Sequence, residues 1–346
     1  MKFSSSAIDT VIPTCIIGPL KLLQGDSSEL VSIPMATFET PLWHSTKRGA
    51  LVSQKTDGIR VALLADAMTR SVILEANDLA GAVSGANWIK NHQRHMSDIV
   101  SSSSRFAKLE ALHVEIVGRM IYLRLSMATG NASGHNMVTK AADLIIDYVV
   151  SHHSGLKYVS ISGNICTDKK ASSVNGILGR GKCVSAEIFV PRNVCASILK
   201  ATPEQIVELN LKKNLVGSIL SGGVRSANAH YANVVLAIFL ATGQDAANIV
   251  EASQGVTFAE VNTDGMLYFS VNLPNIIVGT VGNGKNLDFA RKNLESMGCF
   301  SDAPLSSQRL ATLVAATVLC AELSLMAAQT NRGELVRAHE KLERNS

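Results

Sequence analysis

Hydrophobic residues are most concentrated near the end of the chain, in Leu310–Ala321, which lies between Arg309 and Glu322. The alanine and leucine content of this region favours a helix, and its length suits the centre of a domain. We therefore expect a buried core helix over residues 306–329. The apolar run itself is too short to cross a bilayer, so we expect no membrane-spanning segment.

Shorter patterns along the rest of the chain alternate between strand and helix. Prolines and glycines interrupt the first forty residues, which predicts short extended pieces and turns there. Elsewhere, apolar spacings of three and four predict helices, whereas alternation predicts strands. The expected helices cover 76–103, 137–151, 202–210 and 228–243, and the expected strands cover 113–126 with a turn at Gly118-Arg119, 157–165, 183–191, and 266–279 with a kink at Pro274. This order predicts a mixed α/β (α+β) fold without internal repeats.

Composition and charge narrow the class of protein. The 346 residues are 47% hydrophobic and 17% charged, which predicts a globular chain with a large core and two domains. The net charge is +4, but aromatic residues make up only 5% and do not interleave with runs of Lys and Arg. A nucleic-acid groove requires such a pattern. We therefore expect small anionic ligands and no nucleic acid.

The cysteines and the N-terminus bear on location. The six cysteines, at positions 15, 166, 183, 195, 299 and 320, form no Cys-x-x-Cys pair and lack histidines at metal-ligand spacing. This pattern predicts neither a disulfide framework nor a metal site. The first residues are not followed by the apolar stretch of a signal peptide. Together these features predict a cytoplasmic location.

One short polar segment stands out in this apolar chain. Residues 162–170 read Ser-Gly-Asn-Ile-Cys-Thr-Asp-Lys-Lys. An acid beside two lysines, near a glycine that permits close backbone approach, suits a bound anion and a developing oxyanion. The same residues also suit a solvated surface turn, where charge pairs contribute little. The segment alone leaves both interpretations open.

Three glycine clusters suggest nucleotide binding. Residues 176–182 nearly form a phosphate-binding loop, but Cys183 replaces the required Ser or Thr, and a strand is expected where that motif needs a helix. We therefore do not expect an ATP site. Residues 130–136 follow a strand and precede a helix, a geometry that suits a pyrophosphate or a plain turn. Residues 279–284 form a third loop that either approaches a ligand or simply turns.

Several separated motifs occur together in a fixed order, which is more specific than any single glycine motif. Through these motifs and their order, the chain resembles the catalytic portion of the 3-hydroxy-3-methylglutaryl-CoA (HMG-CoA) reductase family over roughly residues 12–340. The motifs are Pro34-Met-Ala-Thr-Phe-Glu39, Asp66-Ala-Met-Thr-Arg70, Cys166-Thr-Asp-Lys-Lys170, Lys213-Asn-Leu-Val-Gly-Ser218, Asn228-Ala-His-Tyr-Ala-Asn233, Gly243-Gln-Asp-Ala-Ala247 and Glu322-Leu-Ser-Leu-Met-Ala327.

The resemblance implies a four-electron reduction of HMG-CoA to mevalonate and CoA with two equivalents of NADPH, in isoprenoid biosynthesis. It also implies a homodimer or larger homo-oligomer with the active site at the interface. The implied architecture is a large substrate-binding domain, residues 1–71 and 161–346, around a long central helix. A small ferredoxin-like cofactor-binding domain, residues 72–160, is inserted into it. Two alternatives remain: another NAD(P)-linked oxidoreductase of CoA thioesters, and a catalytically silent homologue.

The resemblance also implies roles for four catalytic residues. Lys169 stabilises the oxyanion, and Asp245 holds and tunes Lys169. Glu39 lies near Asp245 and acts as the general acid, because paired carboxylates raise one pKa. His339 protonates the departing CoA thiolate, a role that suits imidazole near neutral pH.

The ligand-binding residues follow from the same motifs. The resemblance implies that substrate carboxylate and hydroxyl groups are bound by Arg70, Ser162, Asp168, Lys170 and Lys213, with His230 and Asn233 in support. Ser104 and Arg105 match a segment that contacts the 2′-phosphate of NADPH, so NADPH is favoured over NADH. The other cofactor-binding residues implied are Asn131, Gly134, Asn136 and Gly282.

The chain also departs from the family pattern. Asn131 and Ser133 replace the usual acidic residue and methionine of the nucleotide loop. Pro41 follows Glu39 closely, and a proline restricts the backbone of the residue before it, here Thr40. The segment before Ile12 lacks the usual substrate-contacting motif. These departures bear on cofactor orientation and on the placement of Glu39.

Overall fold

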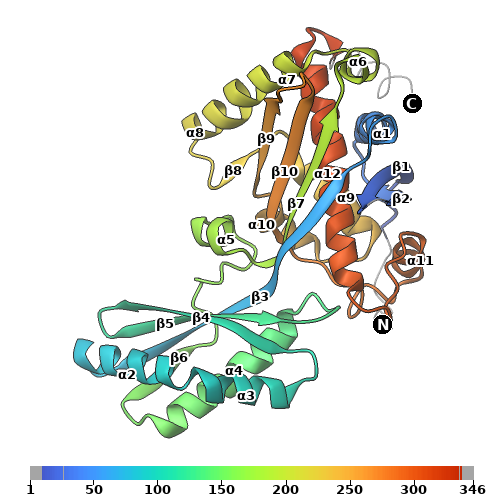
Figure 1. The fold of residues 1–346 in the computed structure, drawn as a ribbon. Coiled ribbons are helices and arrows are strands. Elements are labelled where there is room, and N and C mark those ends of the chain that lie inside the picture. The colour runs from blue at the N-terminus through green and yellow to red at the C-terminus, as the bar shows by residue number, and fades with distance from the viewer. Residues whose placement is uncertain (1–9, 26, 335, 337–346) are drawn as a thin grey trace.

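The computed structural model describes residues 10–25, 27–334 and 336, and Figure 1 shows their arrangement in two parts joined by a long strand. Each part has its own cluster of buried apolar residues. The larger cluster surrounds α12 (Ser306–Thr330), and the smaller one lies between the sheet and helices of the lower part in Figure 1. The prediction of a mixed α/β fold is confirmed.

The predicted core helix is α12, but its length corrects one expectation. The whole helix, at 25 residues and a mean hydropathy of 2.0 in its most apolar window, is long enough to cross a membrane. That window is 89% buried inside the protein, which is typical of a core helix. Its burial within the fold, and not its length, therefore explains its apolar character.

A β-hairpin lies within the first forty residues, where the prolines and glycines predicted short extended pieces and turns. Strand β1 (Thr14–Gln24) pairs antiparallel with β2 (Ser27–Ala36). A helix that we did not expect, α1 (Pro41–Gln54), follows and packs against α12. Pro41 occupies its first turn, where the missing N–H is harmless. Thr40 has φ −60° and ψ −30°, so it adopts the helical conformation that a following proline disfavours, contrary to our expectation.

Helices α1 and α12 approach each other closely at Gly49. A Cβ atom on this residue would lie 2.0 Å from the carbonyl oxygen of Cys320. Only glycine permits this approach, because any side chain would overlap the backbone of α12. The contact fixes the position of α1 against the core helix α12.

Strand β3 (Arg60–Ala76) connects the two parts of the molecule (Figure 1). Its first half, up to Ala67, pairs with β7 (Gly181–Val190) in the large domain. From Met68 onward it pairs with β5 (Met120–Ala128), and near its end also with β6 (Leu156–Ser160). One continuous strand therefore belongs to both sheets, and the expected boundary at residue 72 falls inside it.

The small domain has the order β3, α2 (Leu79–Asn91), α3 (Gln93–Ser103), β4 (Lys108–Val117), β5, α4 (His135–His152) and β6. Its strands lie in the order β4-β5-β3-β6, and all neighbours are antiparallel. This topology is the split βαβ arrangement of ferredoxin-like domains. The predicted helices and the predicted hairpin turn at Gly118-Arg119 are confirmed.

The sheet of the large domain continues from β7 to β10 (Leu267–Ile276), β9 (Gly255–Val261) and β8 (Ser226–Ala227). The pairing of β10 with β7 shifts register between Leu273 and Ile276, which confirms the expected kink at Pro274. The remaining helical elements are α5 (Ser173–Leu178), α6 (Arg192–Val194), η1 (Cys195–Leu199), α7 (Pro203–Leu209), η2 (Asn210–Gly217), α8 (Ser218–Leu220), α9 (Tyr231–Ala241), η3 (Ala246–Asn248), α10 (Ile249–Ala252) and α11 (Asp288–Ser296).

The strand predicted over 157–165 is shorter than expected. Strand β6 ends at Ser160, and the chain then turns through an irregular segment up to α5. Apolar residues such as Ile161 and Ile165 continued the alternating pattern in the sequence, but the chain leaves the strand after Ser160, and Asn164 adopts a φ of 58°. The polar segment identified from the sequence is therefore a loop.

Candidate active site

Residues 162–170 form a loop between β6 and α5, which we call the lysine loop. Three of its non-glycine residues have positive φ angles: Asn164 at 58°, Thr167 at 46° and Lys169 at 55°. Such residues cost free energy and persist only where surrounding contacts hold them, often at functional sites. The contacts of the loop therefore decide how Lys169 is presented.

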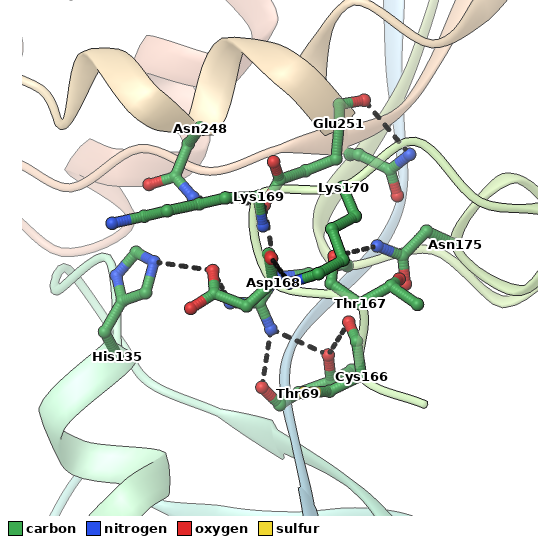
Figure 2. Close-up of polar contacts among 12 residues, drawn as sticks. Thr69, His135, Cys166, Thr167, Asp168, Lys169, Lys170, Asn175, Asn248 and Glu251 are labelled. Atoms are coloured by element: carbon green, nitrogen blue, oxygen red, sulfur yellow. Dashed lines mark hydrogen bonds and ion pairs between the residues drawn. The ribbon is translucent and has the colours of Figure 1, made fainter. Parts of the chain in front are cut away.

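Two almost completely buried residues, Arg180 and Glu251, hold the lysine loop. Figure 2 shows Glu251 beside the Lys169 backbone. Arg180 donates to the Asp168 carboxylate at 2.7 Å and to the Thr69 carbonyl oxygen at 2.6 Å. Glu251 accepts the backbone N–H of Lys169 at 3.0 Å and lies 3.4 Å from the Arg180 guanidinium. Burial raises the pKa of Glu251, while these donors oppose that effect. The buried pair thus fixes the backbone on both sides of the Asp168–Lys169 peptide.

The side chain of Lys169 points away from this anchor toward Asp245, just before η3. Its Nζ lies 2.8 Å from Asp245 Oδ2, and the two side chains are 41% and 47% exposed. The hydrogen bond to Asp245 raises the pKa of Lys169. Partial burial alone would raise the pKa of Asp245, but the bond from Lys169, the Ala247 N–H and the lysine charge outweigh it and lower that pKa. The pair is therefore charged and accessible to a ligand near neutral pH.

His135, the first residue of α4, faces Asp168 of the lysine loop (Figure 2). Its Nε2 is 3.7 Å from Asp168 Oδ1. Burial, followed by the charge of Arg180, lowers the pKa of His135. A neutral imidazole from the small domain thus faces the lysine loop of the large domain.

The two glycine loops lie against each other next to His135. The Thr280 N–H donates to the Asn131 carbonyl oxygen at 2.9 Å, and a Cβ on Gly279 would lie 2.5 Å from the Ser133 nitrogen. The Asn131 side chain donates to Ala303 O at 2.7 Å and accepts from the Ser307 N–H at 3.2 Å. The amide side chain of Asn131 therefore anchors its loop to the start of α12.

The glycines of these loops differ in their surroundings. Gly134 has a φ of 96° at the start of α4, and a Cβ there would lie 2.6 Å from Thr129, so this position is closely packed. Gly282 has a φ of 99° and faces open space. Asn136 is exposed on the first turn of α4. A helix N-terminus beside the open Gly282 loop fits a pyrophosphate group.

A second group of expected residues lies around α9. Asn233 donates to the carboxylate of Glu39 at 2.8 Å. His230 lies 3.9 Å from the buried carboxylate of Glu322. Burial lowers the pKa of Lys213, and the charge of Glu322 opposes this. Within the described part of the chain, no hydrogen bond or ion pair links Glu39 to Lys169 or Asp245, so their expected proximity stays a prediction.

Four expected substrate residues lie on or near the lysine loop. Arg70, on β3, donates to the Ile161 carbonyl oxygen at 3.0 Å. Ser162 is exposed, and Lys170 donates to the Asp168 carbonyl oxygen at 3.2 Å. The fourth residue, Asp168, accepts a hydrogen bond from Arg180, so its carboxylate helps to hold the loop.

The residues expected at the 2′-phosphate follow α3. Ser104 Oγ accepts the backbone N–H groups of Phe106 and Ala107 at 3.2 and 3.4 Å. Arg105 is exposed, with its guanidinium 5.5 Å from the centre of the Phe106 ring. The guanidinium is thus available to an anionic ligand. His339, expected as the thiolate proton donor, lies outside the described residues.

Residues 176–182, where we did not expect an ATP site, run from the second half of α5 into the start of β7. The segment leads into a strand, as expected, and does not open a helix. Lys182 is buried on β7 and pairs with Asp66 at 3.2 Å. The charge of Lys182 is therefore paired with Asp66 inside the protein.

The sequence analysis missed three residues of the site: His135, Arg180 and Glu251. Arg180 lies in the glycine-rich segment 176–182, for which we did not expect an ATP site. The signal that could have indicated its role was a charged residue directly before an apolar strand. His135 stood inside the 130–136 loop without a distinguishing spacing. Nothing near Glu251 indicated a site, because its partners come from other segments of the chain.

The fold and the site together define a two-domain α/β enzyme whose lysine–aspartate pair lies beside a glycine-lined loop. The family model described as hydroxymethylglutaryl-coenzyme A reductase matches residues 8–344. Two similar relatives are 3-hydroxy-3-methylglutaryl-coenzyme A reductases. That of Pyrococcus horikoshii is 42% identical and matches 96% of this chain and 81% of its own, and that of Methanocaldococcus jannaschii is 40% identical over 96% and 82%. The chain therefore belongs to the HMG-CoA reductase family, and it is an oxidoreductase.

A solved structure shows the same fold at low sequence identity. It is the class II 3-hydroxy-3-methylglutaryl-CoA reductase of Streptococcus pneumoniae bound to NADPH in open conformations. The TM-score is 0.75 at 15% identity, covering 95% of this chain and 88% of that chain. The function of the chain is that of its family, the reduction of HMG-CoA in the mevalonate pathway.

Proposed function

We propose that the chain reduces HMG-CoA to mevalonate and free CoA with two equivalents of NADPH, and that Lys169 is the central catalytic residue. The observation that carries this proposal is the exposed ammonium of Lys169, 2.8 Å from Asp245, on a loop whose backbone Arg180 and Glu251 hold. A fixed ammonium stabilises negative charge that develops on a carbonyl oxygen. Asp245 keeps the ammonium charged and oriented.

The residues present fit NADPH. The N-terminus of α4 provides N–H groups for the pyrophosphate, Gly282 leaves the facing loop open, and the exposed Arg105 can pair with the 2′-phosphate. When bound, NADPH supplies hydride to the thioester carbon and then to the aldehyde carbon. The protein residues bind the ligands, hold the oxyanion at Lys169 and deliver protons. The Streptococcus pneumoniae relative binds NADPH, which supports the same choice here.

Glu39 and His339 are the proposed proton donors. Glu39, held by Asn233, donates the proton that completes the alcohol. His339 protonates the thiolate of CoA as it leaves. Arg70, Lys170 and Lys213 supply positive charge for the glutaryl carboxylate of the substrate.

A homodimer with the active site at the interface is part of the proposal. Two apolar pairs, Ile177-Leu178 on α5 and Ile219-Leu220 on α8, are exposed. Ile219 and Leu220 are 78% and 82% exposed. Exposed large apolar side chains are candidates for burial in a protein interface. A second copy would cover them.

The cytoplasm is the proposed location. All six cysteines are free, which suits a reducing compartment. The proposal is consistent with the buried positions of Cys166, Cys195, Cys299 and Cys320.

The direct test follows oxidation of NADPH, and separately of NADH, by the purified protein with HMG-CoA while the released thiol is trapped. Two NADPH oxidised per CoA released would support the proposed reaction. A preference for NADH would contradict the assignment of Arg105 to a 2′-phosphate. No oxidation of either cofactor would contradict the proposed reaction. Light scattering of the same sample measures the oligomeric state, and an active monomer would refute the interface proposal.

A further inference from the structure

The imidazole of His135 has no satisfied hydrogen bond at Nε2. The atom is buried, and among the described residues none accepts from it or donates to it within hydrogen-bond range. Its nearest charged neighbour, Asp168 Oδ1, is 3.7 Å away, which is ion-pair range but too long for a hydrogen bond. Buried polar atoms without partners are uncommon in folded proteins and call for an explanation.

The Asp168 oxygen that faces His135 is already in use. Arg180 Nη2 donates to the same Oδ1 at 2.7 Å. A neutral imidazole competes weakly for this oxygen and leaves Asp168 with Arg180. An imidazolium competes strongly, because hydrogen bonds between charged groups are shorter and about twice as strong as neutral ones.

The position of Asp168 matters for Lys169, its neighbour in sequence. Lys169 has a φ of 55°, which is held only by its surroundings, namely the Glu251 bond to its N–H and the Arg180 bond to Asp168. If Asp168 moves toward His135, one of these two restraints is lost. The backbone of Lys169 would then be held by Glu251 alone, and the ammonium would shift relative to Asp245.

Four charged groups face His135: Arg180 and Lys169 are positive, and Asp168 and Asp245 are negative. Burial disfavours the imidazolium most, the two cations act in the same direction, and the two aspartates oppose them. The outcome is a pKa below the ordinary value for histidine, so the ring is neutral near neutral pH.

We propose that His135 is a positioning residue for the lysine loop: the neutral ring leaves Asp168 bound to Arg180, whereas the protonated ring draws Asp168 away and displaces Lys169. The proposal rests on the proposed function, because it concerns the presentation of Lys169 to the thioester. It joins the small domain, which carries His135, to the catalytic loop of the large domain.

The test is the pH dependence of kcat and KM for the wild type, for His135→Gln and for the control His152→Gln. His152 is an exposed histidine at the other end of α4, so the control carries the same substitution on the same helix. Between about pH 7.5 and about pH 5.5, kcat of the wild type should fall by less than about tenfold, as for one proton with a pKa below about 6.5. Over that range KM should change by less than about twofold, because binding groups are unchanged.

In His135→Gln the acid fall in kcat should shrink to less than about twofold, and His152→Gln should match the wild type. Equal acid limbs in the wild type and His135→Gln would overturn the proposal. So would a folded His135→Gln protein that is inactive at every pH, because a positioning residue acts through Asp168 and Lys169. If His135→Gln does not fold, His135→Asn is measured in the same way.

The thermal midpoint provides a readout that does not need activity. Because the native pKa of His135 is lowered, the unfolded chain binds the proton more readily, and stability is lost as pH falls from about 6.5 through the native value. His135→Gln should lose less stability than the wild type over this range, and an equal loss would contradict the proposal. Failure of the proposed function is distinguishable, since it appears as a wild type that oxidises no NADPH near neutral pH.

Discussion

Removing the Lys169 ammonium should separate catalysis from stability more cleanly than any other single change in this protein. Lys169 and Asp245 are close to half exposed, so their ion pair is screened by water and contributes at most about 1 kcal/mol to folding. The backbone N–H of Lys169, which Glu251 binds, is present in any residue. The substitution Lys169→Ala therefore leaves the anchor of the loop intact.

The catalytic loss should be much larger. Removing one donor to a developing oxyanion costs about 3 to 4 kcal/mol, which is roughly a hundredfold to a thousandfold in kcat. Because the charge develops only in the transition state, kcat should fall while KM changes little. The midpoint of thermal unfolding should fall by less than about 4 °C, as for a change of about 1 kcal/mol.

The assay is steady-state oxidation of NADPH with HMG-CoA, with thermal unfolding followed on the same samples. Lys212→Ala is the matched control, because Lys212 on η2 forms an exposed ion pair with Glu208 on α7, away from the Lys169–Asp245 pair. The control should keep normal kcat and a similar thermal midpoint. Near-normal turnover of Lys169→Ala would refute the assignment of the oxyanion to Lys169, and an equal loss of kcat in Lys212→Ala would show that the effect is not local.

Three further predictions concern the anchor, the core and the thiols. Glu251→Gln should lower the free energy of unfolding by about 1 to 3 kcal/mol, since it removes the buried charge beside Arg180 while Asp168 still pairs with that guanidinium, and it should lower kcat. The exposed control Glu295→Gln should change stability by less than about 1 kcal/mol, and denaturant unfolding distinguishes the two. Gly49→Ala should lower the free energy of unfolding by about 1 to 3 kcal/mol, because α1 must move away from α12. The control Gly217→Ala should be nearly neutral, because its new Cβ would meet only Lys212 O at 3.7 Å. Equal thermal midpoints of the two variants would contradict the close contact at Gly49. In thiol labelling of the native protein, Cys15 should react first, while Cys195 and Cys299 should stay unmodified, since burial raises their pKa values to about 11 and about 12; rapid labelling of either would show that the core opens easily.

The local patterns of the sequence predicted many of the elements correctly. The composition of residues 306–329 was sufficient for a core helix, because a helix surrounded by apolar residues on every face must be apolar all round. The hairpin turn at Gly118-Arg119 and the kink at Pro274 followed from the intrinsic backbone preferences of glycine and proline. Each of these features depends on residues close together in the chain.

The misses have a common cause. Helix α1 starts with a proline and has a mixed composition, so its sequence alone did not indicate a helix. The residues that it buries can be identified only from its packing against α12. The strand expected at 157–165 ended early because the lysine loop is pulled out of the sheet by Arg180 and Glu251. In both places a contact with a distant segment decided the local structure.

The sequence by itself determined the family, the order of the elements and the identity of Lys169 and Asp245 as a candidate pair, because motifs record which residues are present and in what order. Only the tertiary structure decided that His135, Asp168, Arg180 and Glu251 meet at one point. These residues come from four separate segments, and their charges and burial depend on how β3, α4 and α10 pack around the lysine loop. No periodicity along the chain predicts that these four residues lie close together, because their proximity arises from the packing of the whole core.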